Sequence, residues 1–82
     1  MYEIQYKKTA IKALAKINEP YYGAILEAIE KLSDNPRPIG CKKLTGRSGY
    51  RIRVGTYRII YDVIDSHLIV EIVNVGSRGS IY

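Results

Sequence analysis

The hydrophobic pattern of the chain changes its period near residue 50, and this change limits the folds that the chain can adopt. Over residues 10–32, apolar side chains recur every three or four residues, which is typical of amphipathic helices. From Tyr50 onward, apolar and polar residues alternate, which is typical of β-strands. A short alternating stretch, residues 2–6, precedes the helical region. The pattern therefore predicts an α+β domain in which one strand and two helices come before a sheet.

The helical region divides into two helices that form an αα-hairpin with a very short connection. The first helix is expected to begin after Thr9, a suitable N-cap residue, and to end near Asn18. Pro20 suits the first turn of the second helix, and the prolines within residues 35–38 end it. The apolar side chains expected to face the core are Ala10, Ile11, Ala13, Leu14, Ile17, Tyr22, Ile25, Leu26, Ile29 and Leu32.

The C-terminal part of the chain predicts an antiparallel meander of three strands. Residues 50–54 and 57–63 alternate on either side of Gly55-Thr56, which has the length of a two-residue hairpin turn. A second turn is expected at Asp65-Ser66, before a strand over residues 68–75 that is apolar on both faces and therefore central. The short N-terminal strand, the helical hairpin and the meander form a single domain over residues 1–82, with the helices on one face of the sheet.

The net charge of +5 comes from one segment of the chain. Seven basic residues and no acidic ones lie between residues 37 and 61, whereas the rest of the chain carries six basic and eight acidic residues. Such a segment favours a surface for a polyanion. The alternative is a solvated face that only keeps the protein soluble. The seven residues are Arg37, Lys42, Lys43, Arg47, Arg51, Arg53 and Arg58.

Three arginines of this segment are expected to share the face of the sheet that points away from the helices. A two-residue turn at Gly55-Thr56 places Arg53 directly opposite Arg58, with Arg51 two residues along the same strand. Like charges directly opposite each other destabilise a strand pair, so folding alone does not explain them. Guanidinium groups on a rigid surface suit bidentate binding of phosphate oxygens. Arginine stems that merely cover apolar sheet are the alternative.

The expected positions of two further residues, Arg78 and Glu71, depend on the length of the second turn. A two-residue turn there places Gly76 beside Gly55, so that Arg78 lies at the end of the sheet that holds the opposed arginines. An exposed arginine in a fraying tail is the alternative for Arg78. The same register puts Glu71 on the arginine-bearing face, opposite Ile60. There it could orient an arginine, act as a base or form a plain salt bridge.

Several other classes of protein do not fit the sequence. Cys41 is the only cysteine and His67 the only histidine, so neither a disulfide nor a cysteine-based zinc site is expected. No glycine-rich loop follows a strand into a helix, which argues against a nucleotide-binding loop. No secretory signal and no apolar run long enough for a membrane is present, so we expect a cytoplasmic protein without membrane contact or cofactor.

The order of these motifs resembles the RelE/ParE toxin superfamily, and within it the RelE branch. The resemblance covers essentially the whole chain. It rests on Lys43-Leu44-Thr45-Gly46, the basic strand followed by Gly55-Thr56-Tyr57-Arg58, then Val75-Gly76-Ser77-Arg78, and the final Ile81-Tyr82. RelE-type toxins are ribosome-dependent mRNA endoribonucleases from toxin–antitoxin pairs. The resemblance therefore implies metal-independent cleavage of mRNA, in which a ribose 2′-hydroxyl attacks the adjacent phosphate.

The resemblance also implies roles for individual residues. The arginines would stabilise the negative charge on the pentavalent phosphorus, and the terminal tyrosine would stack on a base or take part in proton transfer. The catalytic residues implied in this way are Arg51, Arg53, Arg58, Arg78 and Tyr82. Contacts to RNA or the ribosome are expected from Lys42, Lys43 and Arg47. The implied partners are a cognate RelB-like antitoxin, the ribosome and mRNA, with DNA contacted only through the antitoxin complex.

Two other functions are compatible with the same fold. A ParE-like toxin inhibits gyrase and has no nuclease chemistry, whereas the arginine cluster and Tyr82 favour the nuclease. An inactive relative would only bind its antitoxin. Ser77 supports this last alternative, because many members of the family have His or Lys at that position.

Overall fold

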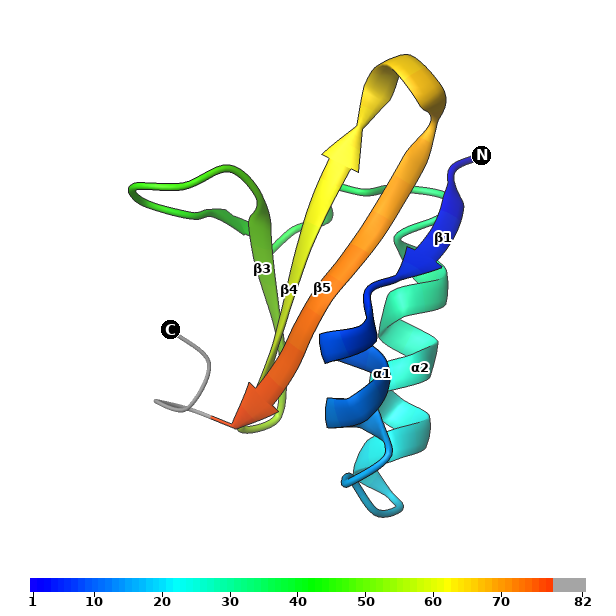
Figure 1. The fold of residues 1–82 in the computed structure, drawn as a ribbon, viewed down its shortest axis with the longest axis vertical. Helices are drawn as coiled ribbons and strands as arrows, with labels where there is room; N and C mark the ends of the chain where they lie inside the picture. The colour runs from blue at the N-terminus through cyan, green and yellow to red at the C-terminus, as the bar shows by residue number, and fades with distance from the viewer. Residues whose placement is uncertain (78–82) are drawn as a thin grey trace.

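Residues 1–77 are described by a computed structural model, in which five strands form one mixed sheet and two helices cover one of its faces (Figure 1). The order of strands in the sheet is β1-β5-β4-β3-β2. β1 runs parallel to β5, and the other neighbours are antiparallel. The elements are β1 (Glu3–Tyr6), α1 (Lys8–Leu14), α2 (Tyr21–Lys31), β2 (Lys42–Lys43), β3 (Tyr50–Val54), β4 (Tyr57–Ile64), the 3-10 helix η1 (Asp65–His67) and β5 (Ile69–Ser77).

This architecture confirms the predicted α+β fold, with the helices on one face of the sheet. The strand over the last apolar run, β5, lies between β1 and β4, as its apolar residues on both faces predict. The sequence pattern does not predict β2, because two consecutive lysines show no alternation. Neither helix within residues 1–77 is long and apolar enough to cross a membrane.

The first helix is shorter than its pattern predicts. α1 ends at Leu14 rather than near Asn18, because the next turn tightens and the backbone N–H of Ile17 donates to the carbonyl of Leu14 at 3.1 Å. The prediction of Thr9 as N-cap is wrong. Thr9 lies within the first turn of α1, and its hydroxyl donates to the carbonyl oxygen of Val73 on β5.

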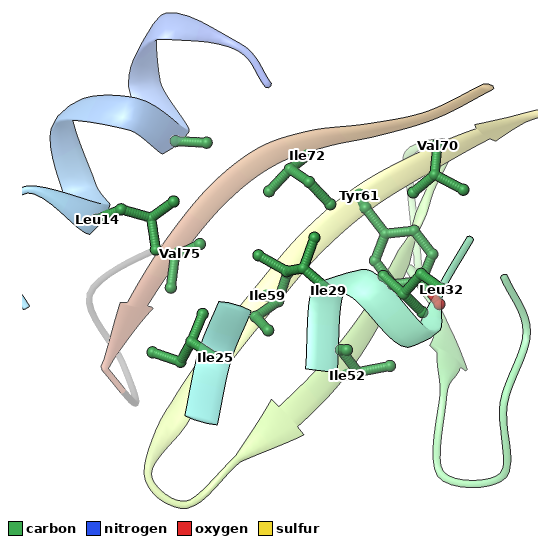
Figure 2. Close-up of a cluster of buried hydrophobic side chains, with 11 residues drawn as sticks. Leu14, Ile25, Ile29, Leu32, Ile52, Ile59, Tyr61, Val70, Ile72 and Val75 are labelled. Carbon is green, nitrogen blue, oxygen red and sulfur yellow. The ribbon is translucent and has the colours of Figure 1, made fainter. Parts of the chain in front are cut away.

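The core lies between the two helices and the sheet, as Figure 2 shows. Ile25 and Ile29 of α2 are completely buried and confirm the predicted apolar side of that helix. Tyr61 of β4 is also completely buried. The sequence pattern predicts Ile11 in this core, but Ile11 is 55% exposed. Ile11 follows the buried Ala10 in the helix, and each residue is rotated about 100° around the helix axis from the one before it. This rotation turns Ile11 away from the core.

The turn between β4 and β5 is longer than the predicted Asp65-Ser66. The chain forms η1 and then passes through Leu68, which has a left-handed backbone conformation with a φ of +52°. The longer turn changes the register of the two strands. Glu71 lies opposite Asp62, and the prediction that it lies opposite Ile60 is wrong.

A β-bulge shifts the same pair of strands once more. Between Ile60 and Tyr61 of β4, the partner on β5 moves from Asn74 to Ile72, so Val73 has no partner on β4. As a result, Gly76 lies opposite Arg58 and not beside Gly55 as predicted.

Candidate nucleic-acid interface

The β3–β4 hairpin holds the opposed arginines in the predicted register. Arg53 pairs with Arg58 across the hairpin, and Arg51 pairs with Ile60. The turn between them places Gly55 at a φ of +60°, a conformation that glycine adopts without strain. The side chains of Ile52 and Ile59 are buried on the opposite, helix-facing side of the hairpin. We call Arg51, Arg53 and Arg58 the arginine face.

The three side chains of the arginine face differ in their exposure. Arg53 is exposed and Arg58 is half-buried, but Arg51 is only 9% exposed. The difference follows from the sheet, because Arg51 has strand neighbours on both sides, Lys42 on β2 and Ile60 on β4. β2 does not extend as far as Arg53. The sequence pattern predicts a shared face but not this burial.

The arginine face has an excess of positive charge. Neither Arg51 nor Arg53 forms an ion pair with a carboxylate among residues 1–77. The salt bridges of this part of the chain are Lys7–Glu71, Lys31–Glu27 and Arg37–Asp65. Arg51 lines two open hollows, so an anion bound there would pair with its guanidinium.

Two of the hollows beside the arginine face adjoin β2 and the hairpin turn. The larger of these two, about 340 Å³, is lined by Lys42, Lys43, Leu44, Thr45, Arg47 and Arg51. The structure therefore brings the three predicted RNA-contacting residues next to Arg51. The smaller, about 140 Å³, lies at the hairpin turn between Arg53 and Arg58. None of the described residues that line these hollows is acidic.

Gly49 holds the basic loop of residues 44–49 close to β4. Its φ is +111°, and a Cβ atom there would lie 2.9 Å from the carbonyl oxygen of Tyr61 and 2.8 Å from Oδ1 of Asp62. The loop is closed by a hydrogen bond from the backbone N–H of Leu44 to the carbonyl of Gly49, at 3.0 Å. The glycine thus allows this end of the loop to approach β4, whereas a side chain would clash with Tyr61 and Asp62.

Arg37 does not belong to the arginine face, although it lies in the basic segment of the sequence. Its guanidinium donates to Oδ2 of Asp65 at 2.8 Å and to the hydroxyl of Tyr50 at 3.0 Å. Tyr2 also donates to Asp65, at 2.6 Å. The hydrogen bonds from Arg37 and Tyr2 hold the pKa of Asp65 below its ordinary value. The charge of Arg37 is therefore paired, and the prediction that it adds to the polyanion surface is wrong.

Three other predicted residues have different outcomes. Glu71 does not lie beside the arginines, because Asp62 is its partner on β4 and Lys7 its ion-pair partner, at 4.0 Å. Arg78 and Tyr82 lie outside the described residues 1–77.

Sequence reasoning did not single out Thr45 and Thr56, whose hydroxyl-bearing side chains line the two hollows. Their only signal is their position next to a glycine in a turn.

Comparison with known proteins gives consistent matches over most of the chain. A family model described as the ParE toxin of the type II toxin–antitoxin system parDE matches residues 4–82. A RelE-like toxin protein of Escherichia coli is 32% identical over 80 residues, which cover 94% of this chain and 83% of that protein. Toxin RelG of Mycobacterium tuberculosis is 33% identical over 85 residues, covering 99% of this chain and 95% of RelG.

A solved structure has the same fold. The toxin–antitoxin complex RelBE2 from Mycobacterium tuberculosis contains a chain that is 31% identical, with a TM-score of 0.82. The match covers 94% of the present chain and 98% of the other one.

Proposed function

The chain belongs to the RelE/ParE family of toxins from type II toxin–antitoxin systems, and from this premise we propose that it cleaves mRNA on the ribosome as a RelE-type endoribonuclease. The observation that carries the proposal is the pairing of Arg53 directly opposite Arg58 on a rigid hairpin, beside the buried Arg51. This arrangement costs stability in the sheet and gains a concentrated positive surface for phosphate.

The arginine face supports attack of a ribose 2′-hydroxyl on the adjacent phosphate. The reaction forms a pentavalent phosphorus with extra negative charge and leaves a 2′,3′-cyclic phosphate after the 5′-oxygen departs. A positioned donor to such developing charge is worth about 3–4 kcal/mol in enzymes. Arginine stays protonated, so Arg51, Arg53 and Arg58 act by electrostatic stabilisation and not as bases. The resemblance to RelE-type toxins adds Arg78 as a fourth cation and Tyr82 for base stacking or proton transfer.

The basic residues of β2 and of the loop that follows it support binding to structured or single-stranded RNA. The positive surface continues into the hollow of about 340 Å³, where the basic lining residues besides Arg51 are Lys42, Lys43 and Arg47. The arginine face itself offers no strong base, so correct orientation of the mRNA has to supply part of the rate enhancement. The ribosome provides that orientation in this proposal, which places the protein in the cytoplasm.

An antitoxin completes the proposal. The RelBE2 structure that matches this chain is a toxin–antitoxin complex. By analogy, we expect a RelB-like antitoxin to bind this chain and neutralise it, and any contact with DNA to pass through that complex.

The test is cleavage of mRNA on stalled ribosomes by the purified chain. Wild-type protein should cut ribosome-bound mRNA, and Arg58→Ala should cut at least about 100-fold more slowly while its circular dichroism is unchanged. Arg37→Ala is the matched control, because Arg37 is an arginine of the same segment that is paired with Asp65. Equal cutting by wild type and Arg58→Ala would refute the role of the arginine face.

A ParE-like toxin is the second candidate, because the family model that matches residues 4–82 is described as a ParE toxin. Gyrase inhibition would produce a DNA-damage response on expression while mRNA stays intact. An inactive relative that only binds its antitoxin would cause no growth inhibition at all. The two outcomes differ from each other and from loss of mRNA, so one expression experiment separates the three functions.

A further inference from the structure

A groove lies between α2 and the outer edge of β3, next to the arginine face. We call it the edge groove, and its volume is about 430 Å³. This volume is within the range of about 300–1,000 Å³ that is usual for small-ligand sites. The lining residues that matter here are Ala28, Lys31, Ile39, Lys42, Ile52 and Arg53.

The groove exists because the edge of β3 is only partly paired. β2 covers Tyr50 and Arg51 of β3, and its register ends there. Before β2, the chain passes through Gly40, whose φ of +94° lies in the left-handed region that glycine tolerates. Among residues 1–77, the strand order therefore leaves β3 from Ile52 onward without an outer neighbour.

The edge groove combines an apolar surface with a cationic rim. Ala28 and Ile52 give it apolar walls, and the side chain of Ile39 is fully exposed to solvent. Lys31, Lys42 and Arg53 supply the positive charges, and none of its described lining residues is acidic. The ion pair between Lys31 and Glu27, at 3.5 Å, lies on the exposed side of α2 and holds the lysine only weakly. Such a site suits a ligand with an apolar ring and a phosphate.

The groove is continuous with the arginine face. Arg51 lines both the edge groove and the larger hollow beside Lys43, and Arg53 lines the edge groove and the smaller hollow at the hairpin turn. A polyanionic strand on the arginine face therefore meets no acidic residue among those that line the two hollows and the groove. This continuity favours RNA over a separate acidic peptide.

We propose that the edge groove binds a nucleotide of the RNA strand adjacent to the one whose phosphate lies on the arginine face. The base packs against Ile39 and Ile52, and its phosphate contacts Lys31 and Lys42. The inference rests on the proposed function, since it concerns the path of the same RNA strand. It adds a contact outside the reacting phosphate, and therefore a source of affinity or base preference.

The test is an NMR titration of the ¹⁵N-labelled chain with a single-stranded RNA tetranucleotide that carries 2′-O-methyl groups and cannot be cleaved. Binding should shift the backbone amide signals of Ala28, Gly40 and Ile52. Ile39→Ala and Lys31→Gln should each weaken binding of the tetranucleotide about fivefold or more. Ile11→Ala and Lys16→Gln are matched controls, because both residues are exposed and lie outside the groove, and they should bind as wild type.

The outcomes separate this inference from the proposed function. Shifts confined to Arg53, Gly55 and Arg58, with normal binding by the Ile39 and Lys31 variants, would overturn the edge groove and leave the nuclease intact. Absence of any shift would overturn it as well. A groove that responds to an acidic peptide but not to RNA would belong to a protein partner, which also contradicts the inference. Failure to cut ribosome-bound mRNA, with the groove still binding RNA, would refute the nuclease alone.

Discussion

The hydroxyl of Thr9 donates a hydrogen bond to the carbonyl oxygen of Val73, the residue of β5 that has no partner on β4. The contact joins the first turn of α1 to the β-bulge. The bulge shifts the register of β5 by one residue and so places Gly76 opposite Arg58. Glycine has no side chain, so this position adds no bulk beside the arginine face.

Replacement of Thr9 should therefore destabilise the domain. We expect Thr9→Val to lower the free energy of unfolding by about 1 kcal/mol, because the bulge loses its hydrogen bond from the side chain. Urea denaturation measures this change. Thr45→Val is the control, since Thr45 lies in an exposed loop. Equal stability of the two variants would show that the contact to Val73 contributes nothing.

Acid should weaken the cluster of Arg37, Asp65 and Tyr2. The pKa of Asp65 is held below its ordinary value of 3.8, first by the hydrogen bond from Arg37 and then by that from Tyr2. A carboxylate with a lowered pKa stabilises the folded state above its ordinary pKa, and this contribution is lost as the pH falls through the lowered value. Urea midpoints should therefore fall below about pH 4 in the wild type. In Asp65→Asn the midpoint should start lower and fall less over this range.

The buried hydroxyl of Tyr61 should matter in a different pH range. It donates to the carbonyl oxygen of Pro36 at 2.7 Å, and burial raises the pKa of this phenol. We expect Tyr61→Phe to cost about 1–2 kcal/mol of folding free energy, because the carbonyl of Pro36 loses its partner. A raised pKa stabilises the folded state below about pH 10, and the contribution is lost at higher pH. The alkaline decrease in stability should thus be smaller in Tyr61→Phe, and an unchanged decrease would contradict this account.

The opposed arginines should show a trade-off between stability and activity. Arg53→Gln removes the like charge opposite Arg58 and should raise the free energy of unfolding by about 0.2–1 kcal/mol, while cleavage of ribosome-bound mRNA decreases. Added NaCl should stabilise the wild type more than the variant, because salt screens the repulsion. Denaturation at two salt concentrations measures the change in stability, and the cleavage assay measures the change in activity.

The control for this trade-off is Arg47→Gln. Arg47 is exposed in the loop of residues 44–49 and lies outside the strand pairs, so its replacement should leave stability nearly unchanged. A stabilisation as large as that of Arg53→Gln would mean that net charge, and not the cross-strand pair, is responsible.

The β3–β4 hairpin could be predicted from the sequence because its register depends on local residues. The two-residue turn at Gly55-Thr56 fixes the partners of every residue in the hairpin, and the alternation on both strands agrees with it. The opposition of Arg53 and Arg58 follows from this turn alone. The helical core positions Ile25 and Ile29 were predictable for a similar reason, since their spacing within one helix reveals the buried side.

The remaining features depend on contacts between distant parts of the chain. The register of β4 with β5 involves a bulge at Val73 whose carbonyl is bonded by Thr9, and no local pattern near residue 73 reveals it. The burial of Arg51 depends on β2, which is too short to show a period. Arg37 is paired with Asp65. Asp65 lies outside the basic segment of residues 37–61, so counting the charges of that segment alone does not reveal the ion pair.

The parallel pairing of β1 with β5 has a consequence for biosynthesis. Glu3 pairs with Ile69, so the first strand has to wait for nearly the whole chain before it finds this neighbour. Contacts between residues so far apart in sequence slow folding, because the intervening chain must be ordered first. A nascent toxin would thus complete its sheet only late in translation.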